Sequence, residues 1–270
     1  MTVSRALTIA GSDSGGGAGI QADLKTFTVL GVYGMSALTA ITAQNTLGVH
    51  GIYNLPLEAI AQQIDAVASD IGVDAVKTGM LSQAPIIETV AQRIQANRIQ
   101  NLVVDPVMVA KGGARLLQQD SQQALIRHLL PLAAVITPNL PEAEVLTGRT
   151  IRTVDEMKEA ARHIHSFGTR YVVVKGGHLD GDALDILFDG ETFAEFVSPR
   201  HETQHTHGTG CTFSAAITSE LAKGRSVHDA VATAKAFITA AIQDTLGLGA
   251  GHGPTNHWAY GKRRQQPITT

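Results

Sequence analysis

Short apolar segments that favour β-strands alternate with longer amphipathic segments through most of this chain. Most of the short segments are apolar on successive residues, which is typical of strands buried on both faces in a parallel sheet covered by helices. The longer segments carry apolar residues at i, i+3 and i+4, the spacing of an amphipathic helix. The alternation predicts an α/β fold with a mainly parallel central sheet. The predicted strands are residues 7–10, 74–76, 102–104, 134–137 and 171–174, and the predicted helices between them are residues 57–71, 85–96, 121–130 and 154–167.

The C-terminal third has a different pattern. An Asp189-Gly190 pair lies between two β-rich segments, and Asp-Gly is a strong hairpin signal. The elements predicted here are hairpin strands at residues 182–188 and 192–197 and helices at residues 212–223 and 227–246. We find no internal repeat and no Pro/Ser-rich linker, so the sequence predicts a single domain over residues 1–260 and a polar tail at residues 261–270.

Composition excludes several classes of function. Lys and Arg number 21 and Asp and Glu 24, a formal net charge of −3, so the electrostatic footprint of a nucleic-acid-binding protein is missing. A single cysteine cannot form an internal disulfide, which fits a reducing compartment. No segment has the apolar pattern of a signal peptide or the ~18 uninterrupted apolar residues of a membrane span. We therefore expect a cytoplasmic protein with no membrane or nucleic-acid partner.

A cluster of glycines at residues 11–19 follows the first predicted strand and precedes a helical pattern at residues 20–30. It is not a dinucleotide fingerprint, because Gly15 and Gly17 would need a third glycine where Ile20 stands, and it is not a Walker A loop either. Glycine lets a ligand approach the backbone closely, and the first loop of an open α/β sheet is a favoured ligand position. The alternative is a tight turn with no ligand.

The segment His201–His205 reads His-Glu-Thr-Gln-His and matches the H-E-x-x-H motif of zinc proteases. That mechanism needs both histidines one turn apart on a helix. Pro199 stands just upstream, glycines follow, and no apolar residue recurs at helical spacing. Cys211 occupies the place of a third histidine ligand. The motif is therefore interpreted as a coincidence in a surface loop.

Gly208, Thr209, Gly210 and Cys211 stand directly before the helical pattern at residues 212–223. The start of a helix offers free N–H groups and a positive dipole end, so it binds anions. The same dipole would lower the pKa of the Cys211 thiol. From these residues alone, an anion site and a glycine-rich cap with a buried, inert cysteine remain equally open.

Four polar side chains follow predicted parallel strands: Asp105, Asn139, Glu142 and Lys175. Parallel strands end at one edge of a sheet, where open α/β folds bind ligands. Carboxylate and amide oxygens suit Mg²⁺ with its waters, and a lysine suits phosphate as a point charge. Their shared position predicts a phosphate and magnesium site.

The whole set resembles the hydroxymethylpyrimidine/phosphomethylpyrimidine kinases of thiamine biosynthesis, a branch of the ribokinase superfamily. The motifs that carry the resemblance are Gly15-Gly16-Gly17-Ala18-Gly19-Ile20-Gln21-Ala22-Asp23, Thr42-Ala43-Gln44-Asn45-Thr46, Lys77-Thr78-Gly79-Met80, Asp105-Pro106-Val107-Met108, Thr137-Pro138-Asn139-Leu140-Pro141-Glu142-Ala143 and His207-Gly208-Thr209-Gly210-Cys211. The resemblance implies a ribokinase-like three-layer αβα sandwich, a homodimer, and two successive reactions that use ATP and Mg²⁺. The first phosphorylates 4-amino-5-hydroxymethyl-2-methylpyrimidine, and the second converts the monophosphate to the diphosphate.

The resemblance also implies roles for single residues. Gln44 would hold the aminopyrimidine edge, which agrees with the donor and acceptor of a carboxamide. The ring pocket would be completed by Asp23, Gly11 and Val107.

At the other end of the site, the anion hole over the transferred phosphoryl group would be Gly208, Thr209, Gly210 and Cys211. ATP would be bound by Lys175, Asn139 and Thr209, and magnesium with its waters would be organised by Asp105, Glu142 and Asn139. A Cys211 thiolate could serve as the base of the first reaction, whereas the second attacks with a phosphate oxygen and needs none.

Three alternative functions stay in view. A pyridoxal or pyridoxine kinase of the same fold would share Gly208–Cys211, and Gln44 argues against it. A regulator that binds the precursor without turnover would not need Lys175 and Asp105. A cysteine hydrolase would need a base such as His207. The stretch from Gln44 to Tyr53 is a candidate flap over the substrate.

Overall fold

The computed structural model describes residues 3–108, 119–177 and 181–265. Its centre is an eight-stranded sheet in the order β10-β9-β8-β7-β6-β5-β1-β2. Strands β1, β2, β5, β6, β7 and β8 run parallel, and β9 and β10 are antiparallel to their neighbours. The bounds are β1 Arg5–Ala10, β2 Tyr33–Leu38, β5 Ala75–Thr78, β6 Leu102–Val104, β7 Ala133–Ile136, β8 Tyr171–Lys175, β9 Ala183–Phe188 and β10 Phe193–Ser198. The mainly parallel sheet is as predicted.

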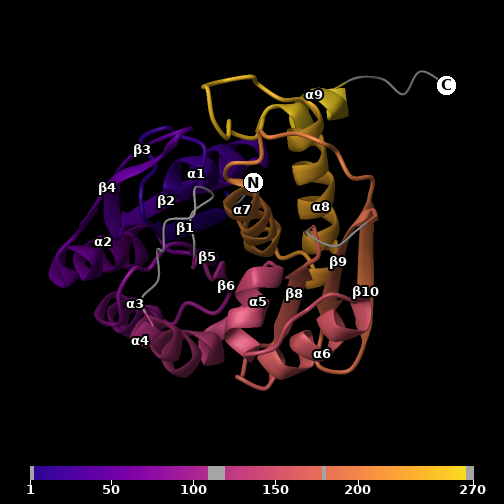
Figure 1. Ribbon diagram of the computed structural model, residues 1–270. Coiled ribbons are helices and arrows are strands. Elements are labelled where there is room, and N and C mark those ends of the chain that lie inside the picture. The colour runs from indigo at the N-terminus through magenta and orange to yellow at the C-terminus, as the bar shows by residue number, and fades with distance from the viewer. Residues whose placement is uncertain (1–2, 109–118, 178–180, 266–270) are drawn as a thin grey trace.

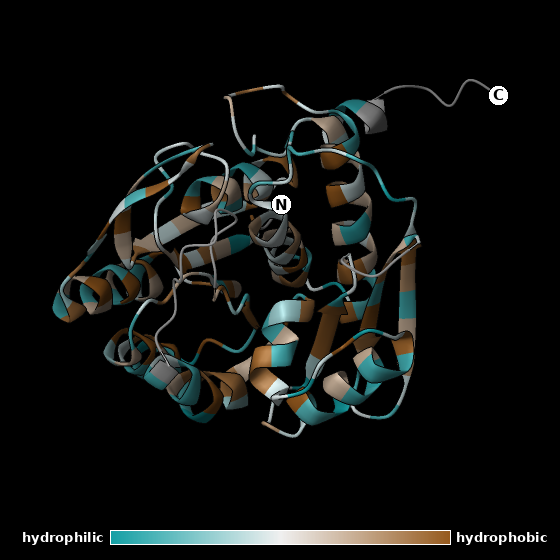
Figure 2. Ribbon diagram, viewed as in Figure 1, coloured by the Kyte–Doolittle hydropathy of each residue, from teal (hydrophilic) through white to brown (hydrophobic). Residues whose placement is uncertain are grey.

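Helices cover both faces of this sheet (Figure 1). One apolar cluster joins the sheet to α2 (Leu57–Asp70), α3 (Ala84–Ala96), α4 (Gln119–Ala124), α5 (Leu140–Thr147) and α6 (Val154–His165). Two further clusters join the opposite face to α1 (Gly19–Val29), α7 (Thr209–Ala222) and α8 (Val227–Gln243). Figure 2 shows apolar strands in the middle and polar helix surfaces outside. The three-layer αβα sandwich is therefore confirmed.

The order of the strands creates a switch point between β1 and β5. From β1 the chain moves through α1 to β2 on one side, and from β5 it continues to β6, β7 and β8 on the other. Adjacent loops at such a point leave opposite faces of the sheet, so a crevice opens at the carboxyl ends of the strands. The fold thus places a ligand site beside the residues that follow β1, β5 and β6.

A separate two-stranded antiparallel sheet projects beside β2. It consists of β3 (Ala40–Asn45) and β4 (Gly48–Asn54), and it was predicted only as a possible flap. A register shift between Ala43 and Gln44 interrupts the pairing at Gln44, the residue that is predicted to bind the substrate ring. A bulge of this kind re-aims the side chains that follow it, which is why bulges recur next to active sites.

Several other predictions can be compared directly. The hairpin at Asp189-Gly190 is confirmed as the β9–β10 pair. The predicted helix at residues 121–130 is α4 followed by a π-helical turn (Leu125–Leu129) and a 3-10 turn (Leu130–Leu132). Helix α9 (Ala259–Gln265) includes residues 261–265 of the predicted polar tail, and it packs on α8. Residues 266–270 lie outside the described part of the chain.

Candidate active site

The predicted charges at the strand ends come together. Asp105 directly follows β6 and Lys175 is the last residue of β8, and Lys175 Nζ lies 3.5 Å from Asp105 Oδ1. Both side chains are nearly buried, at 13% and 3% exposure. Backbone pairing between Asn139 and Lys175 extends the β7–β8 contact to the same edge. An ammonium group therefore stands beside a carboxylate at the floor of the crevice, where both phosphate and a cation could be bound.

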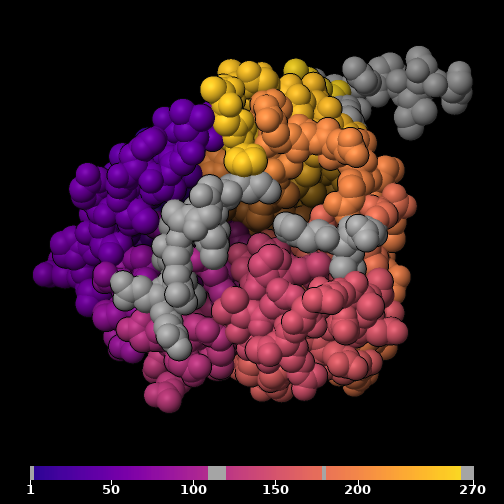
Figure 3. Space-filling model, in the orientation of Figure 1, coloured from indigo at the N-terminus to yellow at the C-terminus, as the bar shows by residue number. Residues whose placement is uncertain are grey.

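The start of α7 lies next to the Lys175–Asp105 pair. Gly208 is the N-cap in the left-handed region, at φ 83°, and among the described residues no side chain caps the helix. A Cβ placed on Gly210 would lie 3.3 Å from Lys175 Nζ and 3.7 Å from Asp105 Oδ2. Figure 3 shows this face hollowed between the N-terminal part, the region of α5 and the C-terminal part. The helix dipole, the open amides and Lys175 therefore all favour an anion at one place.

Glu142 has two roles at this edge. It forms a capping box with Asn139, in which Glu142 Oε2 accepts from Asn139 N at 2.9 Å and Asn139 Oδ1 accepts from Glu142 N at 2.9 Å. Burial raises the pKa of Glu142 to about 7, and Asp105 raises it while Lys175 lowers it. Two neighbouring carboxylates that repel one another would both be stabilised by a divalent cation.

Magnesium fits this donor set. Among the described residues no group of three or more His, Cys, Asp or Glu side chains is placed to hold a metal. Mg²⁺ keeps several waters and takes only one or two protein carboxylates together with phosphate oxygens, so Asp105 and Glu142 suffice. When bound, the ion would neutralise charge on the transferred phosphoryl group.

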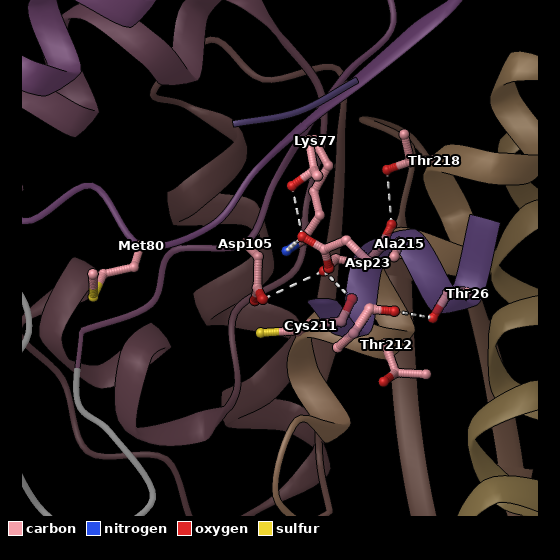
Figure 4. Close-up of polar contacts among 12 residues, drawn as sticks. Asp23, Thr26, Lys77, Met80, Asp105, Cys211, Thr212, Ala215 and Thr218 are labelled. Atoms are coloured by element: carbon pink, nitrogen blue, oxygen red, sulfur yellow. Dashed lines mark hydrogen bonds and ion pairs between the residues drawn. The ribbon is translucent and has the colours of Figure 1, made fainter. Parts of the chain in front are cut away.

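A buried ion pair lies beneath the switch point. Lys77 Nζ, at the end of β5, is 2.9 Å from Asp23 Oδ2 of α1, and both side chains have no exposed surface. Thr8 Oγ1 donates to the same oxygen at 2.6 Å. Figure 4 shows this pair with Asp105 and Cys211 close by. The Oδ2 atom of Asp23 is bonded to Lys77 and Thr8, and its Oδ1 atom has no hydrogen-bond partner among the described residues, so a direct contact between Asp23 and the ring stays a prediction.

The ionisation of Cys211 differs from the prediction. Burial raises the pKa of Cys211 to about 12, with Lys77 lowering it and the carboxylates of Asp105 and Asp23 raising it. The helix dipole was expected to favour the thiolate, but it competes with desolvation and two negative charges. At neutral pH the residue is a thiol in this conformation, and its role as the base of the first reaction stays a prediction.

The glycine cluster after β1 folds around its own aspartate. Asp13 Oδ1 accepts from Gly15 N at 2.8 Å, and Oδ2 accepts from Gly17 N at 3.1 Å and Ala18 N at 2.8 Å. Oδ2 also lies 2.8 Å from His207 Nε2. Burial alone would raise the pKa of Asp13, but His207 and the backbone amides outweigh it, so the pKa lies below its ordinary value. The two glycine-rich segments are thus joined through an ionised carboxylate.

Gln44 reaches the same junction from β3. Its Nε2 atom is placed 3.3 Å from His207 Nε2, and its Oε1 atom is 3.2 Å from Thr42 Oγ1. The side chain is half-buried. The candidate ring-reading residue and the loop before α7 are therefore in contact, although they are far apart in sequence.

The other two predicted ring-pocket residues lie at neighbouring strand ends. Gly11 follows β1 and is buried, and a Cβ there would lie 2.5 Å from Met80 Cε. Val107 follows β6 and lines a small cavity with Asp105 and Thr78. A side chain at position 11 would require the flexible end of Met80 to move.

The end of the chain helps to hold the phosphoryl-transfer loop. His207 N donates to Gly253 O at 3.1 Å, and Thr255 N donates to His207 O at 3.2 Å. Buried His257 lies 3.0 Å from Thr212 Oγ1 through its Nε2 atom. Burial lowers the pKa of His257 to about 4, so it is neutral at pH 7. Residues 253–257 therefore brace both sides of Gly208–Cys211.

The zinc-motif histidines do not form a metal site. Residues 201–205 are not helical, and the imidazole of His201 contacts Gln243. The predicted loop is confirmed, because the two histidines do not lie one turn apart on a helix.

Comparison with known proteins decides the family. The family model described as phosphomethylpyrimidine kinase matches residues 13–256, which include Asp13, both glycine-rich loops and every strand-end charge. The chain belongs to the phosphomethylpyrimidine kinase family. Its site is therefore that of a phosphotransferase.

Relatives of this kinase family match nearly the whole chain. A hydroxymethylpyrimidine/phosphomethylpyrimidine kinase of Bacillus subtilis is 55% identical and covers 96% of this chain and 97% of its own. A crystal structure of an ADP complex of Bacillus subtilis pyridoxal kinase has a TM-score of 0.91 at 49% identity and covers 98% of this chain and all of that one. A phosphomethylpyrimidine kinase structure from Clostridium difficile has a TM-score of 0.79 at 48% identity, with 88% of this chain and 98% of that one covered. The ribokinase-like fold and kinase chemistry follow.

Asp13 and Lys77 were given no role from the sequence, whereas His207 was named as part of the predicted phosphoryl-transfer segment and as a possible base. Asp13 stands among glycines, so it was taken as part of a turn. Lys77 was included in a family motif but given no role, although a lysine inside the apolar end of β5 is an unusual signal.

In the described residues no helix has the length and apolar character needed to cross a membrane.

Proposed function

We propose that this chain phosphorylates 4-amino-5-hydroxymethyl-2-methylpyrimidine with ATP and Mg²⁺, first to the monophosphate and then to the diphosphate used for thiamine biosynthesis. The observation that carries the proposal is the contact between Gln44 and the loop His207–Cys211. It supports a site in which a ring read by Gln44 extends its hydroxymethyl group toward the anion site at α7.

Different residues along the crevice bind the ring, the phosphate groups and the magnesium ion. The carboxamide of Gln44 offers an acceptor to the exocyclic amine and a donor to the adjacent ring nitrogen. The amides of Gly208 and Gly210 and the ammonium of Lys175 bind phosphate oxygens, whereas Thr209 N donates to Thr206 O at 3.3 Å. Asp105 and Glu142 hold magnesium with its waters, and Asn139 and Thr209 lie where ATP enters. Phosphoryl transfer needs mainly positioning and charge stabilisation, which these groups supply.

The decisive experiment changes Gln44 and measures both substrates. In Gln44→Leu the KM for the pyrimidine should rise about a hundredfold, because an unpaired amine and ring nitrogen would be buried against an apolar side chain. The KM for ATP should change less than about twofold, and Gln62→Leu on the exposed face of α2 serves as the matched control. Equal changes for both substrates would remove Gln44 from the ring site.

A second candidate is a pyridoxal kinase, which the similarity to the Bacillus subtilis ADP complex favours. A coupled assay of ADP release with each ring separates the two. Higher kcat/KM for the hydroxymethylpyrimidine supports the main proposal, and faster turnover of pyridoxal would replace it.

We also propose a homodimer in the cytoplasm. The projecting hairpin and the neighbouring edge strand expose Tyr33, Ile41, Leu47, Ile52 and Tyr53, of which Tyr53 is 65% and Leu47 68% exposed. Exposed apolar side chains on a hairpin beside an edge strand favour association. Sedimentation of the purified chain should give twice the monomer mass, and a monomer at micromolar concentration would contradict this.

A further inference from the structure

The proton on His207 is determined by its partner. Asp13 is ionised and can only accept, and its Oδ2 atom lies 2.8 Å from His207 Nε2. Nε2 must therefore carry the hydrogen. A protonated Nε2 cannot accept from an amide N–H, and its single hydrogen is donated mainly to Asp13. The Gln44 atom that lies 3.3 Å away should therefore be the carbonyl oxygen, which receives the weaker share of a bifurcated hydrogen bond.

The second contact of Gln44 leads to the same conclusion. Thr42 Oγ1 donates its single hydrogen to Ser12 O at 2.7 Å. It can then only accept from Gln44, so the amide atom 3.2 Å away should be the NH₂ group. Oxygen and nitrogen of a carboxamide are assigned from such networks. Two independent contacts thus agree on one orientation, with Oε1 toward His207 and Nε2 toward Thr42.

We propose that His207 is a specificity-positioning residue, which fixes the Gln44 carboxamide so that the ring enters with its amine on the side of His207. This rests on the proposed function. One lone pair of Oε1 and one N–H of Nε2 remain for the ring. In the substrate the hydroxymethyl carbon is attached next to the carbon that bears the amine. An amine bonded to Oε1 therefore turns the hydroxymethyl group toward Gly208 and the anion site.

The inference predicts how the enzyme discriminates against a ring in which the hydrogen-bond donor and acceptor of this edge are exchanged. In the 4-oxo analogue, 5-hydroxymethyl-2-methylpyrimidin-4(3H)-one, an acceptor oxygen replaces the amine and the ring nitrogen becomes a donor. A fixed carboxamide would oppose oxygen to oxygen, whereas a carboxamide free to rotate could pair with either ring. His207→Phe keeps the ring volume and removes the donor, so it should release this constraint.

The experiment is a ratio of kcat/KM for the amino ring to that for the oxo ring. In His207→Phe this ratio should fall at least about tenfold relative to the wild type, with the KM for ATP unchanged. His207→Gln, which can place an N–H near the position of Nε2, should restore most of the ratio. His128→Phe, on the surface far from the crevice, is the control and should leave the ratio unchanged.

Thr42→Val tests the same carboxamide orientation from the hairpin, and it should also lower the ratio. It provides the test if His207→Phe does not fold. A ratio that stays at the wild-type value in a folded His207→Phe or in Thr42→Val would overturn the inference. A wild-type enzyme that phosphorylates neither ring would instead overturn the proposed function, so the two failures are distinguishable.

Discussion

Two glycine-rich loops, each leading into a helix on the same face of the sheet, have opposite electrostatic characters. The loop before α1 surrounds its own carboxylate, since Asp13 accepts from the amides of Gly15, Gly17 and Ala18. At the loop before α7, no side chain in the described ranges caps the helix, and Lys175 faces it. The two loops touch, because a Cβ on Gly208 would overlap the carbonyl oxygen of Gly17.

This difference teaches that glycine content alone does not identify an anion site. In the first loop the amides of Gly15, Gly17 and Ala18 are bonded to Asp13, and the same carboxylate holds His207. We expect the second loop to offer the amides of Gly208 and Gly210 to a phosphoryl group that arrives with the reaction. In the loop before α1 the backbone amides thus bind a carboxylate of the protein, whereas in the loop before α7 we expect them to bind a phosphoryl group.

The strongest way to break the contrast is to give the second loop a carboxylate of its own. In Gly210→Asp the new side chain should pair with Lys175 and compete with the phosphoryl group, lowering kcat by about a thousandfold. Gly210→Ala adds only a Cβ near the flexible end of Lys175 and should lose less than about tenfold. ADP release measures both, and equal activity of the two variants would contradict an anion site at Gly210.

The reverse change removes the carboxylate from the first loop. Asp13→Ala leaves three amides and His207 without their acceptor, so the free energy of unfolding should fall by about 3 kcal/mol at pH 7. Because the folded-state pKa of Asp13 is lowered, this contribution is complete above the unfolded-state pKa near 3.8 and disappears as pH falls through the folded-state value.

Urea unfolding at several pH values measures this effect. Asp70→Ala, at an exposed position on α2, is the control and should change stability by less than about 0.5 kcal/mol. A loss in Asp13→Ala that persists unchanged at pH 3 or below would show that the ionised carboxylate is not its source.

The smallest effect is expected at Cys211. With its pKa raised to about 12 the residue is already protonated, so Cys211→Ala should slow both phosphorylations by less than about tenfold. The two steps are assayed separately with the hydroxymethyl and phosphomethyl substrates. A hundredfold loss confined to the first step would restore the thiolate base.

The sequence was most informative where local pattern determines structure. Successive apolar residues identified the buried strands, and the polar residues after them, such as Asp105 and Lys175, were correctly expected at one edge. Strand β2 escaped prediction because its alternating Gly, Ser and Ala residues resemble neither a buried run nor a clear amphipathic strand.

Long-range electrostatics could not be predicted in the same way. Asp13 and His207 are 194 positions apart, so their pairing depends on the packed fold. The helix start that favours a Cys211 thiolate is local in the sequence, whereas the burial and the carboxylates that oppose ionisation come from distant segments, with Asp105 after β6 and Asp23 on α1. The buried ion pair of Asp23 could not be predicted for the same reason, since its partner Lys77 lies on β5.

The brace formed by residues 253–257 has a consequence for the order of events during synthesis. The crevice combines Asp13, near the beginning of the chain, with a loop whose backbone is held by Gly253 and Thr255. A nascent polypeptide can complete the sheet and helices up to α8 and still lack that support. We therefore expect catalytic competence to appear only after residues 253–257 have been made and have folded, so that chains stalled before Gly253 lack it.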